Sequence, residues 1–225
     1  MMPVDKTRML SHNKKSSLFI ANFLIEYVEK FAEVNKCHIW LGGSFLHGGA
    51  TLFSDVDISV FCTCKDLIEL IYGYGKPVYI SYTHKPLGIL IVIYEDGVAV
   101  DLEIIETMNI EGVGYFHTDD IKAYNYIRSE KICRELSLRS DTPYQVSRLF
   151  HRSLIKFLSG KREIGVRTAN EIATFLDPGS LIDESGYANS INDLLKSFDE
   201  QYHLPFKYYN ILRELIEKLN DADCK

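Results

Sequence analysis

The sequence has no long hydrophobic segment, no excess of basic residues and no regular cysteine framework, and each of these absences narrows the possible function. Its longest apolar run, residues 87–94, is far shorter than the roughly 20 residues that cross a bilayer. Lys and Arg number 25 against 31 Asp and Glu, which gives a net charge of −6. Proteins that grip nucleic acid through its phosphates are usually basic. We therefore expect neither a membrane nor a nucleic acid as partner.

The cysteines and the N-terminal residues indicate a reducing compartment. The five cysteines are odd in number and scattered, which favours free thiols over a disulfide framework. Cys62 and Cys64 form a C-x-C pair, but no second pair completes a zinc site. The first 15 residues are polar and lack the apolar stretch of a signal peptide. These features predict a cytoplasmic location.

The first half of the chain carries the alternation of helix and strand signals that is typical of an α/β (α+β) fold. Apolar residues at helical spacing predict a helix from Ser16 and Ser17 to about Asn35, and a second helix is expected over residues 66–72. Strand signals occupy residues 38–41, 56–61 and 78–82. The runs 87–94 and 98–105 flank an Asp-Gly pair, which is a strong hairpin signal. A mixed β-sheet flanked by helices is expected.

The second half is predicted to be helical. Helical patterns cover residues 143–158, 167–176, 188–198 and 205–219, after a predicted loop at 106–120. With 225 residues, the chain is long enough for one to two domains. We predict a catalytic domain over residues 1–117 and a C-terminal helical bundle over residues 118–225 that binds substrate or a partner.

Acidic residues recur on the predicted strands. Asp55 and Asp57 lie in the segment Asp-Val-Asp-Ile, and because strand side chains alternate between faces, these two carboxylates point the same way. Neighbouring carboxylates repel unless a cation lies between them. Asp101 lies on the far arm of the predicted hairpin, and Glu103 shares its strand face. This pattern predicts a site for Mg²⁺, which prefers oxygen ligands and shares its shell with substrate phosphates.

A glycine-rich segment precedes these acids. Gly42, Gly43 and Ser44 follow the predicted strand 38–41, and ten residues separate Ser44 from Asp55. Glycines let the backbone approach a ligand closely. If a helix begins after Gly43, its free N–H groups and the Ser44 hydroxyl can hold a phosphate. A phosphate cradle beside carboxylates suits metal-assisted phosphoryl transfer.

Over residues 37–105 the chain resembles the DNA polymerase β-like nucleotidyltransferase superfamily. The motif of that superfamily is an apolar residue, Gly, Gly or Ser, a spacer, an Asp-apolar-Asp-apolar segment and an acidic residue on a later strand. Gly42-Gly43-Ser44, Asp55, Asp57 and Asp101 occupy these places. The spacing from Gly43 to Asp55 and the helical second half are also similar to the small bacterial aminoglycoside and lincosamide nucleotidyltransferases. Phe45 and His47 depart from the pattern, because small members often carry arginine there.

The resemblance implies an activity and roles for the residues. Asp55 and Asp57 would hold two magnesium ions, and Asp101 would complete the metal site. Asp101 or Glu103 would take the proton of an acceptor hydroxyl, which attacks the α-phosphorus of ATP or another nucleoside triphosphate and releases pyrophosphate. The leading acceptor is an aminoglycoside or lincosamide antibiotic, and Glu103, Glu106 and Glu111 could recognise its amines. Dimerisation stays open, because some members place the active site between two subunits.

Cations of the second half could reach the triphosphate, and Lys156 and Lys161 are the candidates. Three alternatives remain at this point. The chain could be a protein-modifying or toxin–antitoxin-type nucleotidyltransferase that acts on or binds a partner protein. It could add nucleotides to RNA, against which its acidity counts. It could also bind nucleotide without catalysis.

Overall fold

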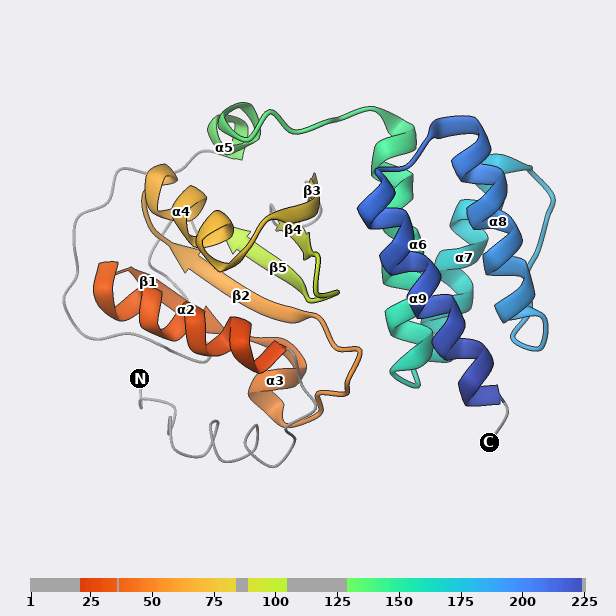
Figure 1. Cartoon of the computed structure of the whole chain (residues 1–225), viewed down its shortest axis with the longest axis horizontal. Coiled ribbons are helices and arrows are strands. Elements are labelled where there is room, and N and C mark those ends of the chain that lie inside the picture. Colours follow the sequence, from red (N-terminus) through yellow and green to blue (C-terminus); the bar gives the residue numbers. More distant parts are fainter. Residues whose placement is uncertain (1–20, 36, 84–88, 105–128, 224–225) are drawn as a thin grey trace. The chain divides into compact units, whose positions relative to one another are not determined.

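A computed structural model of the chain describes residues 21–35, 37–83, 89–104 and 129–223. The chain divides into two compact units, Met1–Leu138 and Arg139–Lys225 (Figure 1). The predicted boundary at residues 117 and 118 lies outside the described residues. The first unit extends to Leu138 because the short helix α5 (Ser129–Glu135), which the sequence did not predict, buries Ile132 completely in the core of that unit.

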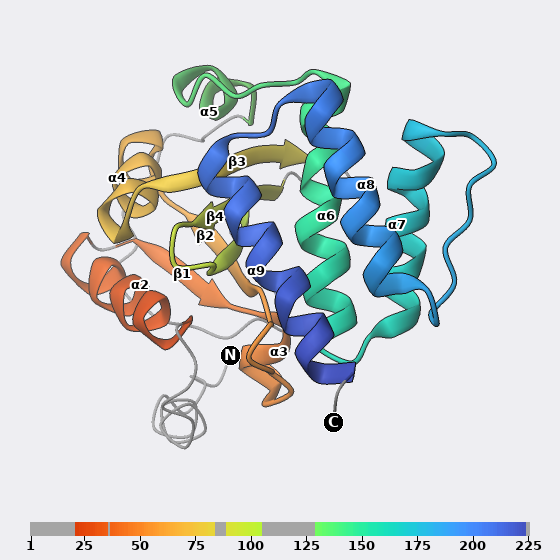
Figure 2. The same ribbon diagram turned by 45° about the vertical axis from the view of Figure 1, so that its right-hand side comes forward.

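The first unit contains a five-stranded mixed sheet with the strand order β1-β2-β5-β4-β3 (Figure 1), and Figure 2 shows the same sheet from a second direction. The strands are β1 (His38–Leu41), β2 (Val56–Phe61), β3 (Pro77–Thr83), β4 (Ile89–Tyr94) and β5 (Ala99–Ile104). Among these pairs only β2 and β5 run parallel, and the other neighbours are antiparallel. The strand predictions are confirmed over the described residues, and the α/β character of this half with them. Residues 87, 88 and 105 of the predicted strands lie outside the described residues.

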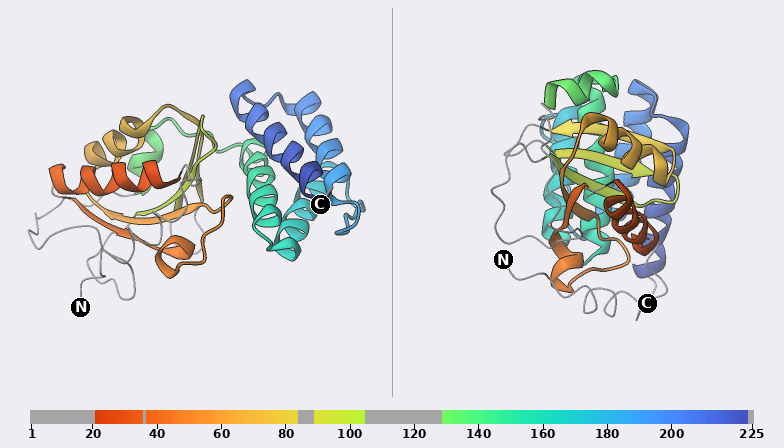
Figure 3. Two further views of the ribbon diagram at one scale, coloured as in Figure 1. Left: turned by 60° about the horizontal axis from the view of Figure 1, so that its bottom comes forward. Right: turned by 90° about the vertical axis from the view of Figure 1, so that its left-hand side faces the viewer.

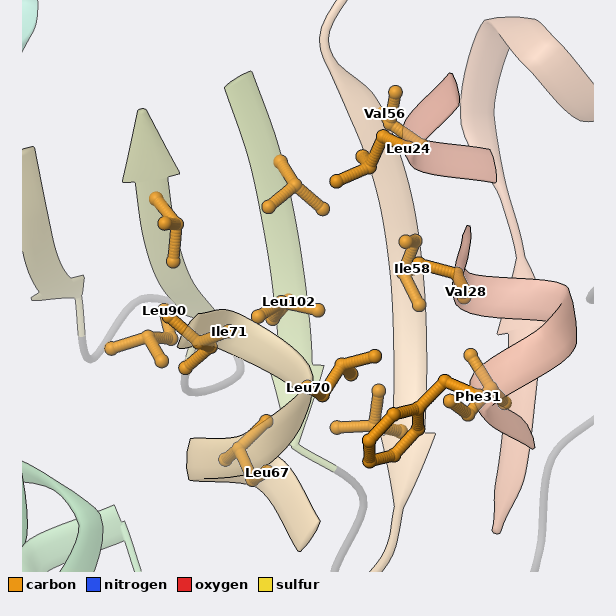
Figure 4. Packing of buried hydrophobic residues seen from close by; sticks show 14 of the residues in the cluster. Leu24, Val28, Phe31, Val56, Ile58, Leu67, Leu70, Ile71, Leu90 and Leu102 are labelled. Atoms are coloured by element: carbon orange, nitrogen blue, oxygen red, sulfur yellow. The ribbon is translucent and has the colours of Figure 1, made fainter. Parts of the chain in front are cut away.

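Two helices cover one face of this sheet. The left view of Figure 3 shows α2 (Ala21–Asn35) and α4 (Cys64–Tyr74) side by side over the strands. Val56 and Ile58 of β2 point toward these helices and pack among their apolar side chains (Figure 4). Period-two alternation therefore directs the even-numbered residues of β2 into the core. The odd-numbered residues, Asp57 among them, lie on the opposite face.

The predicted hairpin is confirmed, and it places the acids of β5. Gly97 has a φ of +82°, a left-handed conformation that glycine adopts without steric cost. The Tyr94 N–H donates to the Val98 carbonyl oxygen at 2.9 Å, and the Val98 N–H donates to Oδ1 of Asp96 at 3.0 Å. This closed turn fixes the register of β4 against β5, and with it the positions of the acidic side chains on β5.

A cluster of three tyrosines joins α2, α4 and β4. The rings of Tyr27 and Tyr74 are 5.8 Å apart, and those of Tyr74 and Tyr94 are 4.7 Å apart. Burial, helped by the nearby Glu69 carboxylate, raises the pKa of Tyr27 to about 12. Burial also raises the pKa of Tyr74 and of Tyr94, and the hydrogen bond from Tyr74 to Asp96 adds to the shift of its pKa. All three hydroxyls therefore resist ionisation in the folded chain.

This cluster predicts a loss of stability in alkali. Tyrosines of the unfolded chain ionise near pH 10, whereas the folded ones hold their protons to about pH 12 or beyond. The unfolded state therefore releases protons first, and the free energy of unfolding should fall as the pH rises above about 10. Urea titrations between pH 8 and 12 measure this slope. Tyr74→Phe should make the slope shallower, and an unchanged slope in that variant would contradict the account.

The second unit is a helical bundle. Its helices are α6 (Thr142–Leu158), α7 (Arg162–Leu176), α8 (Tyr187–Tyr202) and α9 (Phe206–Asp223). They confirm the helical prediction, although α7 begins five residues before the predicted Arg167. A buried hydroxyl joins three of these helices, since Ser153 Oγ lies 2.7 Å from both the Gly165 carbonyl oxygen and the Tyr187 hydroxyl. Within the described residues, no helix has the length and apolar character that crossing a membrane requires.

Candidate functional site

Two of the predicted site acids lie side by side on neighbouring strands. Asp57 of β2 is in register with Asp101 of β5 across the parallel pair. Because in-register residues of a sheet share a face, both carboxylates lie on the face opposite α2 and α4. Both residues are half-buried. The strands stand about 4.8 Å apart in the hydrogen-bonding direction, so the register brings together two groups of like charge.

The glycine pair packs directly on Asp57. The Gly42 N–H donates to the Asp57 carbonyl oxygen at 2.8 Å, which ties the end of β1 to β2. Gly43 has a φ of +57°, and a β-carbon placed on it would lie 1.6 Å from Oδ2 of Asp57. Only glycine leaves the carboxylate its observed position here. Gly42 and Gly43 therefore lie directly against Asp57. The binding of phosphate by Gly42, Gly43 and Ser44 stays a prediction.

The predicted helix after the glycines is present but short. Helix α3 spans Gly43–His47, little more than one turn. A helix of this length has a small dipole, so a phosphate bound here would be held by single N–H groups and the half-buried Ser44 rather than by a helix field. Phe45 is buried in the core and His47 is exposed. Phe45 is thus a packing residue.

A compact turn positions Asp55 at the entry of β2. The Thr51 N–H donates to Oγ of Ser54 at 2.9 Å, and the Ser54 N–H donates to the Thr51 carbonyl oxygen at 3.1 Å. The Phe53 N–H lies 3.3 Å from Oγ1 of Thr51. Side-chain oxygens that bond nearby backbone groups stabilise turns of this kind. Asp55 follows this turn directly and is half-buried.

A second pair on the same face was not predicted from the sequence. Ser59 is in register with Glu103, and Ser59 Oγ donates to Oε2 of Glu103 at 2.6 Å. Ser59 is 5% exposed, while Glu103 is half-buried. The sequence signal was a small polar residue two positions after Asp57 in an otherwise apolar strand. Glu103 thus has a fixed hydrogen-bond donor, one residue row beyond the Asp57–Asp101 pair.

The acidic pair suits a magnesium ion that arrives with phosphates. Magnesium is usually held by one or two carboxylates together with substrate phosphate oxygens and water. Asp57 and Asp101 supply two adjacent carboxylates. Within the described part of the chain, however, no group of three or more His, Cys, Asp or Glu side chains is arranged to hold a metal by itself. The binding of two ions by Asp55, Asp57 and Asp101 together therefore stays a prediction.

The predicted cations lie in the second unit. Lys156 is half-buried in the last turn of α6, and Lys161 is exposed at the residue before α7. The backbone N–H of Lys161 donates to the Lys156 carbonyl oxygen at 2.9 Å, so both belong to the connection between these helices. Their contact with a triphosphate stays a prediction. Glu106 and Glu111 lie outside the described residues.

Comparison with known proteins adds no assignment. The chain matches no protein-family model and no curated protein sequence. What supports a function is therefore the local arrangement of Gly42-Gly43-Ser44, Asp57, Asp101 and the Ser59–Glu103 pair.

Proposed function

We propose that this chain is a magnesium-dependent nucleotidyltransferase of the DNA polymerase β-like type. It transfers a nucleoside monophosphate, AMP from ATP, to a hydroxyl of a small molecule. The observation that carries the proposal is the register of Asp57 with Asp101 beside Gly43, whose missing side chain makes room for the Asp57 carboxylate. A purely structural sheet gains nothing from two like charges in register, since they repel.

Each residue of the site has a role in the proposed reaction. Asp57 and Asp101, with Asp55 at the entry of β2, would hold magnesium, which when bound neutralises phosphate oxygens and aligns the triphosphate. The backbone of Gly42 and Gly43 and the Ser44 hydroxyl would bind phosphate oxygens. An acceptor hydroxyl attacks the α-phosphorus, and a new O–P bond forms. The bond from that phosphorus to the bridging oxygen breaks, and its electron pair leaves with pyrophosphate.

The proton of the acceptor hydroxyl goes to a nearby carboxylate, Asp101 or Glu103. Either lies on the same strand face as Asp57, and a carboxylate within hydrogen-bond reach of the hydroxyl can serve as general base. The rest of the rate enhancement comes from holding nucleophile and phosphorus in line, because phosphoryl transfer depends mainly on positioning and charge. The negative net charge of −6 suits a cationic acceptor.

A mass-shift assay tests this proposal. Purified full-length chain is incubated with ATP, Mg²⁺ and a panel of aminoglycosides and lincosamides, and both the acceptor mass and pyrophosphate are measured. We expect an acceptor heavier by one AMP and an equal amount of pyrophosphate, with neither formed when EDTA removes the metal. ATP binding without pyrophosphate release for any acceptor would reduce the chain to a nucleotide-binding module. AMP attached to a copurifying protein would favour the protein-modifying alternative.

A further inference from the structure

We infer that Cys37 and Cys62 are a redox-active pair, which a small disulfide such as oxidised glutathione converts into a disulfide between β1 and β2. Cys37 directly precedes β1 and Cys62 directly follows β2, and both cysteines are reduced in the structure. Neither residue belongs to the proposed catalytic site. The inference therefore goes beyond the proposed function and does not depend on it.

The register of β1 and β2 places the two cysteines opposite each other. The two strands are antiparallel, and the last residues in register are His38 and Phe61. The next residue outward is Cys37 on one strand and Cys62 on the other. Both cysteines lie among the apolar residues that α2 and α4 cover, on the same face as the even-numbered residues of β2.

The hydrogen bonds of this strand pair fix how close the cysteines lie. At its other end, the Gly42 N–H donates to the carbonyl oxygen of the opposite residue, Asp57. Hydrogen-bonded and non-hydrogen-bonded pairs alternate along antiparallel strands, so Cys37 and Cys62 occupy a non-hydrogen-bonded position. The α-carbons at such a position are about 4.5 Å apart, which falls within the range of roughly 4.4–6.8 Å found for disulfides. A disulfide therefore fits here without a change of register.

The two thiols already interact in the reduced chain. The Cys62 side chain is hydrogen-bonded to Cys37. Cys37 is fully buried and Cys62 is 4% exposed. The hydrogen bond and burial raise the pKa of the Cys62 thiol well above its usual range. Because the thiolate is the reactive form, the first attack on an oxidant has to come from another cysteine.

Cys64 gives the oxidant access to this pair. It is the first residue of α4 and is half-buried. Together with Lys65, Glu69 and Glu135, it lines a hollow of about 420 Å³ between α4 and α5. Cys64 is also close enough to Cys62 to interact with it electrostatically. An exchange that begins at Cys64 can therefore pass inward to Cys62 and then to Cys37.

The exchange moves two electrons from the protein thiols to oxidised glutathione. The Cys64 thiolate attacks one glutathione sulfur, forms a mixed disulfide and releases the other glutathione as a thiolate. Cys62 then attacks the Cys64 sulfur and releases the second glutathione. Cys37 attacks Cys62, and Cys64 leaves as a thiolate again. The protons of the Cys37 and Cys62 thiols end on the two glutathione molecules.

Peptide mapping tests which cysteines pair. The full-length chain is reduced, equilibrated in glutathione buffers of rising oxidised fraction, blocked with N-ethylmaleimide and digested with chymotrypsin. Trypsin does not suit this test, because no Lys or Arg lies between Cys37 and Cys64. We expect a cross-linked product that joins Cys37 to Cys62 and is lighter by two hydrogens, with the blocking group on Cys64. A cross-link between other cysteines, or oxidation only in urea, would overturn the inference.

Thermal unfolding of the oxidised and the reduced chain gives a second measurement. The disulfide closes a loop of about 25 residues and restricts the unfolded chain, so the oxidised wild type should melt roughly 5–10 °C higher. Cys37→Ala should show no such difference, whereas Cys133→Ala, the matched control, should keep it. If Cys37→Ala does not fold, the wild-type cross-link and melting shift still decide. Equal melting temperatures for the two wild-type forms would contradict the pairing.

The rate of oxidation tests the role of Cys64. Cys64→Ala should form the same Cys37–Cys62 disulfide at least about tenfold more slowly, because the buried pair then has no accessible thiol beside it. Cys133→Ala should keep the wild-type rate. An unchanged rate in Cys64→Ala would refute the access route. None of these measurements requires nucleotide or acceptor, so their outcome is distinguishable from that of the proposed function.

Discussion

Asp57→Asn should abolish nucleotidyl transfer while the chain stays folded. The amide has the shape of the carboxylate but lacks the charge that holds magnesium, and metal stabilisation of the transferring phosphoryl group is worth several kcal/mol. At about 1.4 kcal/mol per tenfold, we expect turnover to fall roughly a thousandfold or more. Pyrophosphate release and Mg·ATP calorimetry measure the loss.

The stability of this variant provides the control. Because Asp57 and Asp101 are in register and repel, removing one charge should leave the urea midpoint unchanged or slightly higher. Asp193→Asn changes an exposed aspartate of α8 and should leave both activity and stability near wild type. Near-normal turnover in Asp57→Asn would refute the metal-binding role of the acidic pair and the proposed function with it.

Gly43→Ala should remove activity by a steric route. The added β-carbon would lie 1.6 Å from Oδ2 and 2.6 Å from Cγ of Asp57, so the carboxylate has to move away from its place. The φ of +57° adds a backbone cost of about 1–2 kcal/mol for any residue with a β-carbon. We expect transfer to fall at least a hundredfold, because small misplacements of a catalytic group cost about that much. The same pyrophosphate assay measures this loss.

Two other glycines separate the steric effect from the backbone cost. Gly97 has a φ of +82° with open space around it, so Gly97→Ala should lose stability but keep its activity. Gly49 also has open space, and Gly49→Ala should keep both stability and activity. Activity in Gly43→Ala that matches Gly97→Ala would mean that the contact between Gly43 and the Asp57 carboxylate has no role in catalysis.

Local patterns predicted most of the fold. The Asp-Gly turn at 96–97, the alternation along β2 and the apolar stripes of α6 to α9 each involve residues close in sequence, and all three predictions are confirmed. Helix α5 was missed, because seven residues carry too little periodicity to be recognised. The predicted helix start at Ser16 and Ser17 lies outside the described residues.

The candidate site was predicted less completely, because its geometry depends on which strands pair. Asp57 and Asp101 were recognised by their strand positions, but only the parallel pairing of β2 with β5 places them in one row. Ser59 and Glu103 are 44 residues apart, and no local pattern shows that one donates to the other. The contact of Gly43 with Asp57 also joins residues that no local pattern connects. The sequence predicts a close approach of the Gly43 backbone, but not that the Asp57 carboxylate lies where a β-carbon would be.

The acidic pair forms where two parts of the sheet meet. β5 pairs with β4 on one side and with β2 on the other. Asp57 and Asp101 therefore come together only where the β1–β2 pair meets the β3–β4–β5 segment. Repulsion between the two carboxylates opposes the pairing of β2 with β5, and a divalent cation bound to both strands would favour it. Ion binding and assembly of the whole sheet are then thermodynamically linked, and Mg·ATP should stabilise the folded chain by RT ln(1 + [L]/Kd), so that the melting temperature keeps rising with the free Mg·ATP concentration.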